Sequence, residues 1–188
     1  MRVIAGEYRS RILQAPRGLD TRPTSDRLRE TLFNVVAPRI QDAVFLDLYA
    51  GSGAVGIEAL SRGAREAIFV EQAAAAMKAI RANLASLGIR GNYALEPRGV
   101  AAAVERLAEQ GQTADIVFLD PPYAQAAAYE ETLGLLGGVC RSVLAEEALV
   151  IAEHEKRLDL DARYGALERY RALRQGDAAL SFYRVGEE

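Results

Sequence analysis

Cysteine and histidine are scarce in this sequence, and their scarcity excludes several kinds of site. The single cysteine, Cys140, cannot form an internal disulfide, and it has no cysteine or histidine partner at metal-ligand spacing. We therefore expect a reducing compartment and no structural zinc or other metal. The single histidine, His154, has no serine, cysteine or second histidine arranged around it, so a catalytic triad is not expected.

Long apolar runs are also missing. No stretch of about 18 residues is apolar and free of charge, and the N-terminus lacks the basic, apolar, small-residue order of a signal peptide. We therefore expect a cytoplasmic protein without membrane association. The 188 residues, 50% of them hydrophobic and 26% charged, are typical of one soluble globular domain with a real core. Nothing in the sequence indicates an oligomer, and we expect a monomer.

An excess of positive charge, typical of nucleic-acid binders, is absent from the chain as a whole, whose formal net charge is -3. The distribution is uneven, however. The first 40 positions hold eight arginines and four acidic residues, a local charge of +4, which leaves -7 for the remainder. This asymmetry predicts a basic arm on an acidic catalytic body, the alternative being a solvated face that happens to be basic. Arginine suits bidentate phosphate contacts.

From residue 44 onward, short apolar runs alternate with helical stretches, as in strand-helix-strand units. Strands are predicted at 44–48, 67–71, 92–95, 115–119 and 148–152, and a closing hairpin of 167–173 and 179–185 adds antiparallel strands at the edge. We therefore predict an α/β, Rossmann-like fold with a mostly parallel seven-stranded sheet. The predicted domains are an N-terminal arm of residues 1–43, containing a small hairpin and a helix capped by Ser25, and a catalytic domain of residues 44–188 packed beneath it.

A glycine-rich loop follows the first predicted strand and opens a helix. It reads Gly51-Ser52-Gly53-Ala54-Val55-Gly56, and the acidic Glu71 ends the next strand 20 residues later. These are the parts of the dinucleotide-binding fingerprint, in which glycines let a ligand approach the backbone and a carboxylate accepts hydrogen bonds from ribose hydroxyls. On this motif alone a dehydrogenase is an open alternative. Asp47 lies just before the loop, where it would repel a pyrophosphate and attract an ammonium group, which favours S-adenosylmethionine.

The string Asp47-Leu48-Tyr49-Ala50-Gly51-Ser52-Gly53 resembles the first motif of Rossmann-like methyltransferases. The resemblance implies that the loop cradles the methionine part of S-adenosylmethionine, that Glu71 binds the ribose and that Gln72 lies beside the adenosine. The sequence departs from this class at the end of the third strand, where Arg98 stands in the approximate place of the usual Asp or Asn. We expect the backbone at Gly99 or Val100 to bind the adenine instead.

The tetrapeptide Asp120-Pro121-Pro122-Tyr123 follows the fourth predicted strand, at the edge where open parallel sheets bind ligands. The two prolines remove two N–H donors and leave the Asp120 carboxylate and the Pro121 carbonyl as acceptors. Two acceptors can hold the hydrogens of an amine so that its lone pair faces a methyl carbon, and Tyr123 offers a face for stacking a planar substrate. The tetrapeptide therefore predicts methyl transfer to an amino group without a metal. Adenine, guanine and protein glutamine all remain possible acceptors.

Two strings in the arm, at residues 2–13 and 21–34, resemble the RsmD family of 16S ribosomal RNA guanine-N2 methyltransferases. The resemblance continues through 47–60, 120–123 and 180–184, and so covers nearly the full chain. It implies the class I S-adenosylmethionine-dependent methyltransferase fold, methylation of the 2-amino group of a guanine in a 16S RNA hairpin loop, and S-adenosylhomocysteine as product. The substrate would be the small subunit or an assembly intermediate, with ribosomal proteins as additional partners.

The arm is expected to contact RNA. The candidate RNA-binding residues are Arg2, Arg9, Arg11, Arg22, Thr24 and Arg27. The alternative for Arg27 is solvation on a helix surface. Two alternative functions also stay open: an adenine-N6 methyltransferase of DNA or RNA, which would normally add a sequence-reading domain, and an assembly factor that binds the cofactor without catalysis.

Overall fold

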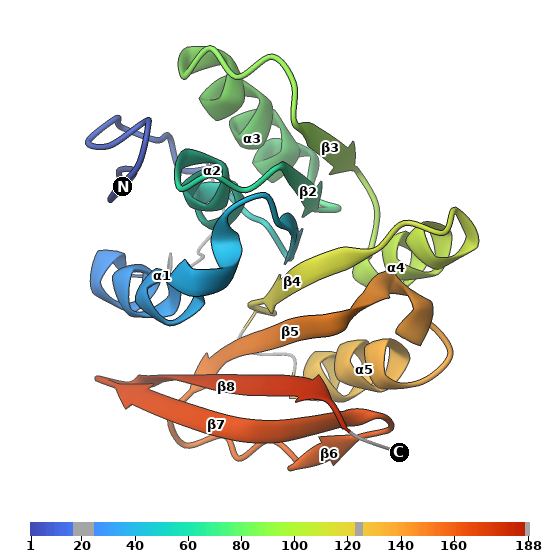
Figure 1. Ribbon diagram of the computed structural model, residues 1–188. Coiled ribbons are helices and arrows are strands. Elements are labelled where there is room, and N and C mark those ends of the chain that lie inside the picture. The colour runs from blue at the N-terminus through green and yellow to red at the C-terminus, as the bar shows by residue number, and fades with distance from the viewer. Residues whose placement is uncertain (17–24, 123–125, 187–188) are drawn as a thin grey trace.

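One sheet of eight strands crosses the molecule in the order β3-β2-β1-β4-β5-β8-β7-β6 (Figure 1). The computed structural model describes residues 1–16, 25–122 and 126–186. Its elements, in chain order, are α1 (Asp26–Ile40), β1 (Val44–Leu48), α2 (Ala54–Ser61), β2 (Glu66–Val70), α3 (Ala74–Ser86), β3 (Tyr93–Glu96), α4 (Val100–Glu109), β4 (Ala114–Leu119), α5 (Ala126–Gly137), the short 3-10 helix η1 (Arg141–Val143), β5 (Leu144–Glu155), β6 (Arg163–Tyr164), β7 (Leu167–Gln175) and β8 (Ala178–Val185).

The sheet combines a parallel part with an antiparallel edge. Strands β1 to β5 pair in parallel, whereas β8 pairs antiparallel with both β5 and β7. The predicted mostly parallel sheet with an antiparallel edge hairpin is therefore confirmed. The sheet has eight strands instead of seven because the two-residue β6 pairs with β7. A strand of two residues is too short to show the alternating pattern by which strands are recognised in a sequence.

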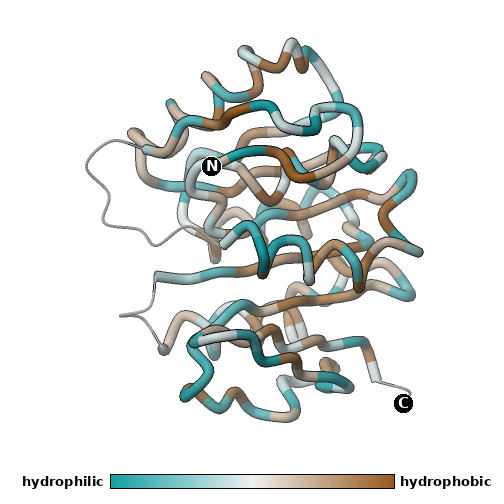
Figure 2. Tube along the Cα trace, turned by 90° about the vertical axis from the view of Figure 1, so that its left-hand side faces the viewer, coloured by the Kyte–Doolittle hydropathy of each residue, from teal (hydrophilic) through white to brown (hydrophobic). Residues whose placement is uncertain are grey.

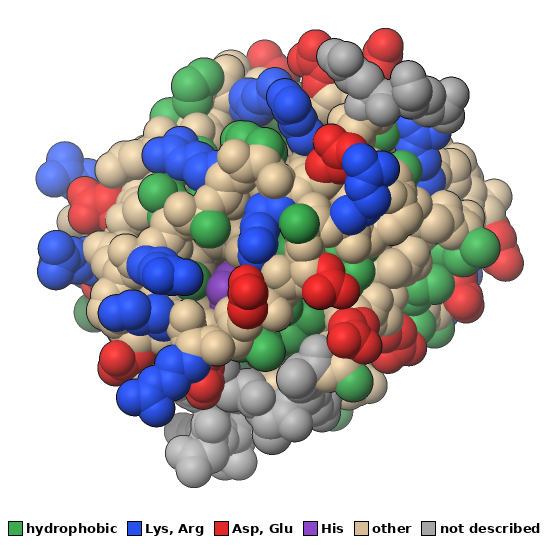
Figure 3. Space-filling view, turned by 90° about the horizontal axis from the view of Figure 1, so that it is seen from below, with side chains coloured by type: hydrophobic (Ala, Val, Ile, Leu, Met, Phe, Trp, Pro, Cys, Tyr) green, Lys and Arg blue, Asp and Glu red, His purple; other side chains and the backbone are tan. Residues whose placement is uncertain are grey.

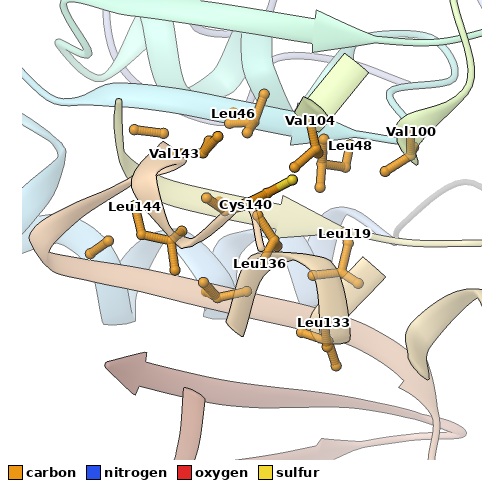
Figure 4. Close-up of a cluster of buried hydrophobic side chains, with 14 of the residues drawn as sticks. Leu46, Leu48, Val100, Val104, Leu119, Leu133, Leu136, Cys140, Val143 and Leu144 are labelled. Atoms are coloured by element: carbon orange, nitrogen blue, oxygen red, sulfur yellow. The ribbon is translucent and has the colours of Figure 1, made fainter. Parts of the chain in front are cut away.

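Helices cover both faces of the sheet. Helices α1, α2 and α3 pack on one face, where Phe45 of β1 and Phe118 of β4 lie among apolar residues of α1 and α2. Helices α4 and α5 pack on the other face, and Figure 4 shows Val104, Leu133 and Leu136 there, close to the strand residues that the same view labels. The parallel strands are buried on both faces, so each is a nearly continuous apolar run, which explains why the sequence revealed them.

The strand order reverses direction at β1, which lies between β2 and β4. Open α/β sheets bind ligands in the crevice outside the carboxyl ends of the strands at such a switch point. Strands β4 and β5 point to the left in Figure 1, and Figure 2 views the molecule from that side. The topology therefore places the candidate site at this edge, between β1 and β4.

The N-terminal arm is attached to the body through buried polar side chains. Residues 1–13 form a hairpin with one antiparallel bridge, between Arg2 and Ile12. Glu58 of α2 is fully buried, and its carboxylate accepts hydrogen bonds from the backbone N–H groups of Ile4 and Ala5 at 2.8 and 3.0 Å. The small hairpin predicted from the sequence is thus present, and hydrogen bonds to Glu58 attach it to the body. Whether residues 1–43 form a separate folding unit stays a prediction.

Helix α1 begins where the sequence predicts. The Ser25 side chain accepts a hydrogen bond from the Leu28 N–H at 3.1 Å and so caps the helix. The helix continues to Ile40, three residues beyond Ala37, where the sequence predicts its end, and its apolar face packs against β1, β4, β5 and β8. Among the described residues, no helix is both long and apolar enough to cross a membrane.

Candidate active site

The loop between β1 and α2 forms the floor of the site, and Asp47 supports it from below. Asp47 is 1% exposed, and its carboxylate accepts a hydrogen bond from the Gly56 N–H at 2.9 Å. The pKa of Asp47 is raised from 3.8 to about 7, mainly by burial; the Gly56 N–H opposes this shift, and the nearby Glu71 charge adds to it. A cation entering this site would favour the ionised form of Asp47.

The three glycines of the loop have different roles. A Cβ on Gly51, whose φ is +56°, would meet no atom closer than the Tyr49 carbonyl oxygen at 4.0 Å, so this backbone faces open space. A Cβ on Gly56 would lie 2.4 Å from the Phe69 ring, and one on Gly53 would lie 3.2 Å from Ile80. Gly51 therefore leaves room for a ligand, whereas Gly53 and Gly56 let the loop and α2 pack closely on the sheet.

Glu71 closes the next side of the site. Its two carboxylate oxygens accept hydrogen bonds from the N–H groups of Gly51 at 2.9 Å and Ala73 at 2.8 Å. The carboxylate expected to bind a ribose is thus positioned by the cofactor loop itself. Each oxygen accepts two hydrogen bonds when ionised, so these bonds leave acceptor capacity for a ligand.

The segment that leads from β3 into α4 contributes the third side through Arg98, Gly99 and Val100. The Arg98 guanidinium forms an ion pair with Glu96 at 2.8 Å, which holds it beside the strand end. A Cβ on Gly99 would lie 3.3 Å from the Gln72 side-chain oxygen, so Gln72 and Gly99 are neighbours. The structure thus brings together the residues expected around the adenosine.

These segments line one cavity of about 270 Å³. Of the predicted cofactor residues, the cavity is lined by Asp47, Tyr49, Ala50, Gly51, Ser52, Glu71, Gln72, Arg98, Gly99, Val100 and Asp120. Gly53 and Gly56 lie behind the loop and do not reach it. The cavity therefore unites most of a site that the sequence distributes over more than 70 positions.

The acceptor end of the cavity is formed by the residues that follow β4. Asp120 and Pro122 line the cavity, Pro121 is buried and Pro122 is exposed. Leu119, the last residue of β4, pairs with Ala152 of β5 and with Leu48 of β1, so Asp120 lies level with the start of the cofactor loop. Tyr123, predicted to stack on the substrate, falls outside the described residues.

Tyr49 connects the cofactor loop to the helix that follows the tetrapeptide. Its φ of +60° is unusual for a residue other than glycine. Its hydroxyl lies 2.8 Å from the Thr132 hydroxyl of α5, within hydrogen-bond distance. This contact fixes the spacing between the loop and α5 on the acceptor side, and Thr132 carried no signal in the sequence.

Sequence reasoning missed the part of the arm that reaches the cavity. Met1, Ala15 and Pro16 line it although the sequence marks none of them. Asn83 of α3 holds this part in place, because its amide nitrogen donates to the Gln14 carbonyl at 3.0 Å and to the Ser52 carbonyl at 2.9 Å. The buried Asn83 side chain thus connects the arm to the cofactor loop.

Of the predicted RNA-binding arginines, those that the structure describes do not line the cavity. Arg2 pairs with Asp26 at 3.7 Å, and Arg11 donates to the Ser86 carbonyl at the end of α3 at 2.8 Å. The hairpin turn that carries Arg9 lies on the C-terminal end of α2, where the Ser61 carbonyl accepts from the Glu7 N–H at 2.8 Å. This end is about 12 Å from the cofactor loop, given eight helical residues at about 1.5 Å each.

Arg27 is exposed on α1, and Arg22 and Thr24 fall outside the described residues. The other residues weighed as nucleophiles or ligands are structural. His154 is buried, and its ring nitrogen Nε2 lies 2.8 Å from the buried Ser181 hydroxyl. Cys140 packs in the core against α4 and α5. Within the part of the chain that the structure describes, no three His, Cys, Asp or Glu side chains cluster as metal ligands.

Comparison with known proteins now adds to this geometry. The family model described as conserved hypothetical protein 95 matches residues 1–184. The small-subunit ribosomal RNA methyltransferase D of Escherichia coli K12 is 44% identical over 155 residues, which cover 82% of this chain and 75% of that protein. The chain belongs to the RsmD family.

Solved structures support the family and its fold. The structure of yhhF from E. coli, described as a candidate methyltransferase, is 38% identical and covers 100% of this chain and 99% of that chain, with a TM-score of 0.84. A protein from Streptococcus mutans described as a candidate S-adenosylmethionine-dependent methyltransferase is 15% identical, has a TM-score of 0.69 and covers 85% of this chain but 48% of that one. At this identity the likeness shows the fold alone, which is the methyltransferase fold predicted from the sequence.

Proposed function

We propose that this member of the RsmD family transfers a methyl group from S-adenosylmethionine to the 2-amino group of a guanine in small-subunit ribosomal RNA. The target would be a base in a 16S RNA hairpin loop, methylated in the small subunit or in an assembly intermediate. The observation that carries the proposal is that the cofactor loop, Glu71 and Asp120 line the same cavity. The family and the name of the E. coli relative support ribosomal RNA as substrate, and the sequence resemblance supports the guanine amine.

The residues of the cavity fit S-adenosylmethionine. Gly51 leaves open space where a ligand approaches the backbone, and Glu71 retains acceptor capacity for ribose hydroxyls. Asp47 lies under the loop and can attract the ammonium group of the methionine part. Bound here, S-adenosylmethionine would supply an electrophilic methyl carbon together with its own sulfonium leaving group.

The protein then has to position and polarise the amine. The exocyclic nitrogen of guanine is a poor nucleophile because its lone pair is delocalised into the ring. The Asp120 carboxylate and the Pro121 carbonyl are acceptors for its two hydrogens, and holding both hydrogens favours a pyramidal nitrogen. Proximity and alignment are expected to account for most of the remaining rate acceleration.

Asp120 has a second task, which comes late. The amine proton becomes acidic only after the methyl group has arrived, so a carboxylate of ordinary basicity suffices to accept it. The proton can then pass to solvent. No step requires a strong base.

A loop base is a reasonable target for this cavity. An enzyme that reacts with a base atom has to extrude the base from its stack, and extrusion costs least where the base is not paired. Asp120 lies at the carboxyl edge of the sheet and lines the cavity, so an extruded base would approach the cofactor from this edge.

The proposal can be tested with small-subunit particles from cells that lack the modification. The particles should accept one labelled methyl group from this protein and S-adenosylmethionine, whereas fully modified particles should accept none. Naked 16S RNA, run in parallel, shows whether ribosomal proteins contribute to recognition. Unmodified particles that remain unlabelled while the protein binds S-adenosylmethionine would overturn the proposal and favour a non-catalytic assembly factor.

A further inference from the structure

A second hollow lies at the same edge of the sheet, on the far side of β4 from the cofactor cavity. We call it the basic groove. It measures about 810 Å³ and lies between the first turn of α1, the end of β5 and the β7-β8 turn. The groove is lined by Ser25, Arg27, Leu28, Glu153, Glu155, Lys156, Arg157, Arg174, Gln175, Gly176, Asp177 and Ala178. Its walls thus come from three parts of the chain that are distant in sequence.

The walls are fixed to one another by specific contacts. The Thr31 hydroxyl of α1 lies 2.8 Å from the Gln175 side-chain oxygen at the end of β7. The Lys156 N–H donates to the Asp177 carbonyl at 2.8 Å, which connects the end of β5 to the β7-β8 turn. Leu173 and Ala178 pack against the core formed by α1 and the sheet. The groove is therefore a built feature of the fold.

Positive charge is concentrated in the groove. Four exposed cations, Arg27, Lys156, Arg157 and Arg174, line it, against three carboxylates, of which those of Glu155 and Asp177 are exposed and that of Glu153 is buried. Figure 3 shows Lys and Arg side chains gathering on its left, the side on which α1 and the β7-β8 turn lie in Figure 1. The exposed side chains of the groove are thus mainly cationic, although the formal net charge of the chain is -3.

The cations of the groove are not used by the fold. Within residues 1–16, 25–122 and 126–186, none of the four forms an ion pair with an acidic side chain. Neighbouring arginines on the same hairpin differ, because Arg169 pairs with Asp159 and Arg171 lies 5.9 Å above the Phe182 ring. The cations of the groove remain available for an anionic ligand.

The groove lies at the same edge of the sheet as the acceptor end of the active site, on the neighbouring strands. Leu119 pairs with Ala152, so Asp120 and the groove residue Glu153 follow paired positions on neighbouring strands. Glu155 pairs with Ala178, so the β7-β8 turn lies at this same edge. Three strand spacings, roughly 14 Å, separate the end of β4 from the end of β7. A base held at Asp120 would therefore place its adjoining backbone over the groove.

We infer that the basic groove binds the RNA phosphate backbone next to the target nucleotide, with Arg27, Lys156, Arg157 and Arg174 as the phosphate-binding residues. The inference rests on the proposed function and specifies how its substrate is held. Arginine and lysine are the residues that neutralise backbone phosphates. In this arrangement the cofactor lies on one side of Asp120 and the RNA backbone on the other. The two ligands therefore do not compete for space while the base is held at Asp120.

The test uses the triple variant Lys156→Gln, Arg157→Gln and Arg174→Gln. These side chains are exposed, so the variant should fold, and its S-adenosylmethionine affinity should equal that of the wild type. A control double variant, Arg65→Gln with Arg141→Gln, removes two exposed cations at the opposite edge of the sheet. Methyl transfer to unmodified small-subunit particles is measured as a function of particle concentration at several salt concentrations.

The triple variant should raise the KM for particles about tenfold at moderate salt and leave kcat within about twofold. It should also lower the slope of log affinity against log salt by about 2, since each phosphate contact to a single strand contributes about 0.7. The control should behave as the wild type. A triple variant with unchanged KM and slope, beside an active wild type, would refute the groove while leaving the proposed function intact. An inactive wild type would instead refute the proposed function.

Discussion

The two halves of the carboxyl edge of the sheet bind their ligands by different means. On the β1-β2-β3 side, the cavity is formed mainly by backbone, glycines and two carboxylates held by backbone N–H groups. On the β5-β8-β7 side, the basic groove presents the ends of long, exposed side chains. Asp120 lies between the two halves. A small cofactor of fixed shape needs a fixed cradle, whereas a polyanion can be held by charges that adjust to it.

The two halves also differ in how strongly they are coupled to the stability of the fold. The cofactor half buries Asp47 and packs Gly56 against Phe69, so changes there should affect stability as well as binding. The groove half leaves its charges in solvent, so changes there should affect RNA binding alone.

The largest effect is expected at the boundary between the halves. Asp120→Ala should lower methyl transfer by about 10²- to 10³-fold or more, since it removes an acceptor aimed at the reacting amine. The dissociation constant for S-adenosylmethionine should change little. Asp120→Asn retains one acceptor oxygen and should lose less, and Glu146→Ala, exposed near the start of β5, is the inert control. If the rate of methyl transfer by Asp120→Ala stays within tenfold of the wild-type rate, the tetrapeptide is a rigid loop without a catalytic role.

The buried carboxylate of the cofactor half should make stability depend on pH. The pKa of Asp47 is about 7 in the folded protein, above its ordinary value of 3.8, so the folded state keeps a proton that the unfolded state loses. Stability from this group is complete below about pH 4 and is lost as the pH rises to 7. The wild type should lose up to about 3 kcal/mol more than Asp47→Asn between pH 5 and pH 8.

Urea unfolding at these two pH values measures that difference, and each variant serves as its own reference. If the unfolding free energies of the wild type and of Asp47→Asn change in parallel, Asp47 is ionised throughout this pH range. Its burial then does not make stability depend on pH.

The glycines of the loop should differ in what they do for the fold. Gly56→Ala places a methyl group 2.4 Å from the Phe69 ring and should cost about 1 to 3 kcal/mol of unfolding free energy. Gly134→Ala in α5 meets no atom within 4 Å and should stabilise by up to about 1 kcal/mol. Phe69→Leu should restore part of the loss in a Gly56→Ala background. Equal stabilities for the two alanine variants would contradict the packing role of Gly56.

The smallest effects are expected at Arg9 and Arg11 in the hairpin of the arm, which line neither the cavity nor the groove. Arg11 donates to the Ser86 carbonyl, so Arg11→Ala should cost about 1 kcal/mol of stability or less and leave the salt dependence of particle binding nearly unchanged. Arg9 is exposed at the hairpin turn, and Arg9→Ala should lower the salt slope by about 0.7 if it contacts a phosphate. If Arg11→Ala lowers the salt slope and Arg9→Ala does not, then Arg11 contacts RNA and Arg9 is a solvated surface residue.

Much of the cofactor half could be predicted from the sequence, because its parts obey local rules. The strand Val44–Leu48 is an apolar run bounded by a glycine loop, and the structure has it at the predicted residues. The end of β4 and the fifteen-residue α1 were also visible, through an apolar run before Asp120 and a capping serine. Short motifs encode this half because backbone geometry depends on neighbouring residues.

The remainder could not be predicted, because it depends on contacts between distant segments. Glu58 and Asn83 anchor the arm, but a glutamate and an asparagine in ordinary helices carry no local mark. The start of β5 was missed because Glu146 and Glu147 interrupt its apolar pattern at the exposed end of the strand. The basic groove was missed for the same reason as the anchors, since its cations come from three segments that only the folded sheet brings together.

Mass mapping of the methylated nucleotide tests the central claim most directly. Unmodified small-subunit particles are incubated with the protein and labelled S-adenosylmethionine, and the 16S RNA is digested and sequenced by mass. The account predicts one added methyl group, on the 2-amino nitrogen of a single guanine in a hairpin loop, and labelling by Asp120→Ala that is slower by about 10²-fold or more. Label on the 6-amino nitrogen of adenine, or on ribosomal protein, would contradict it.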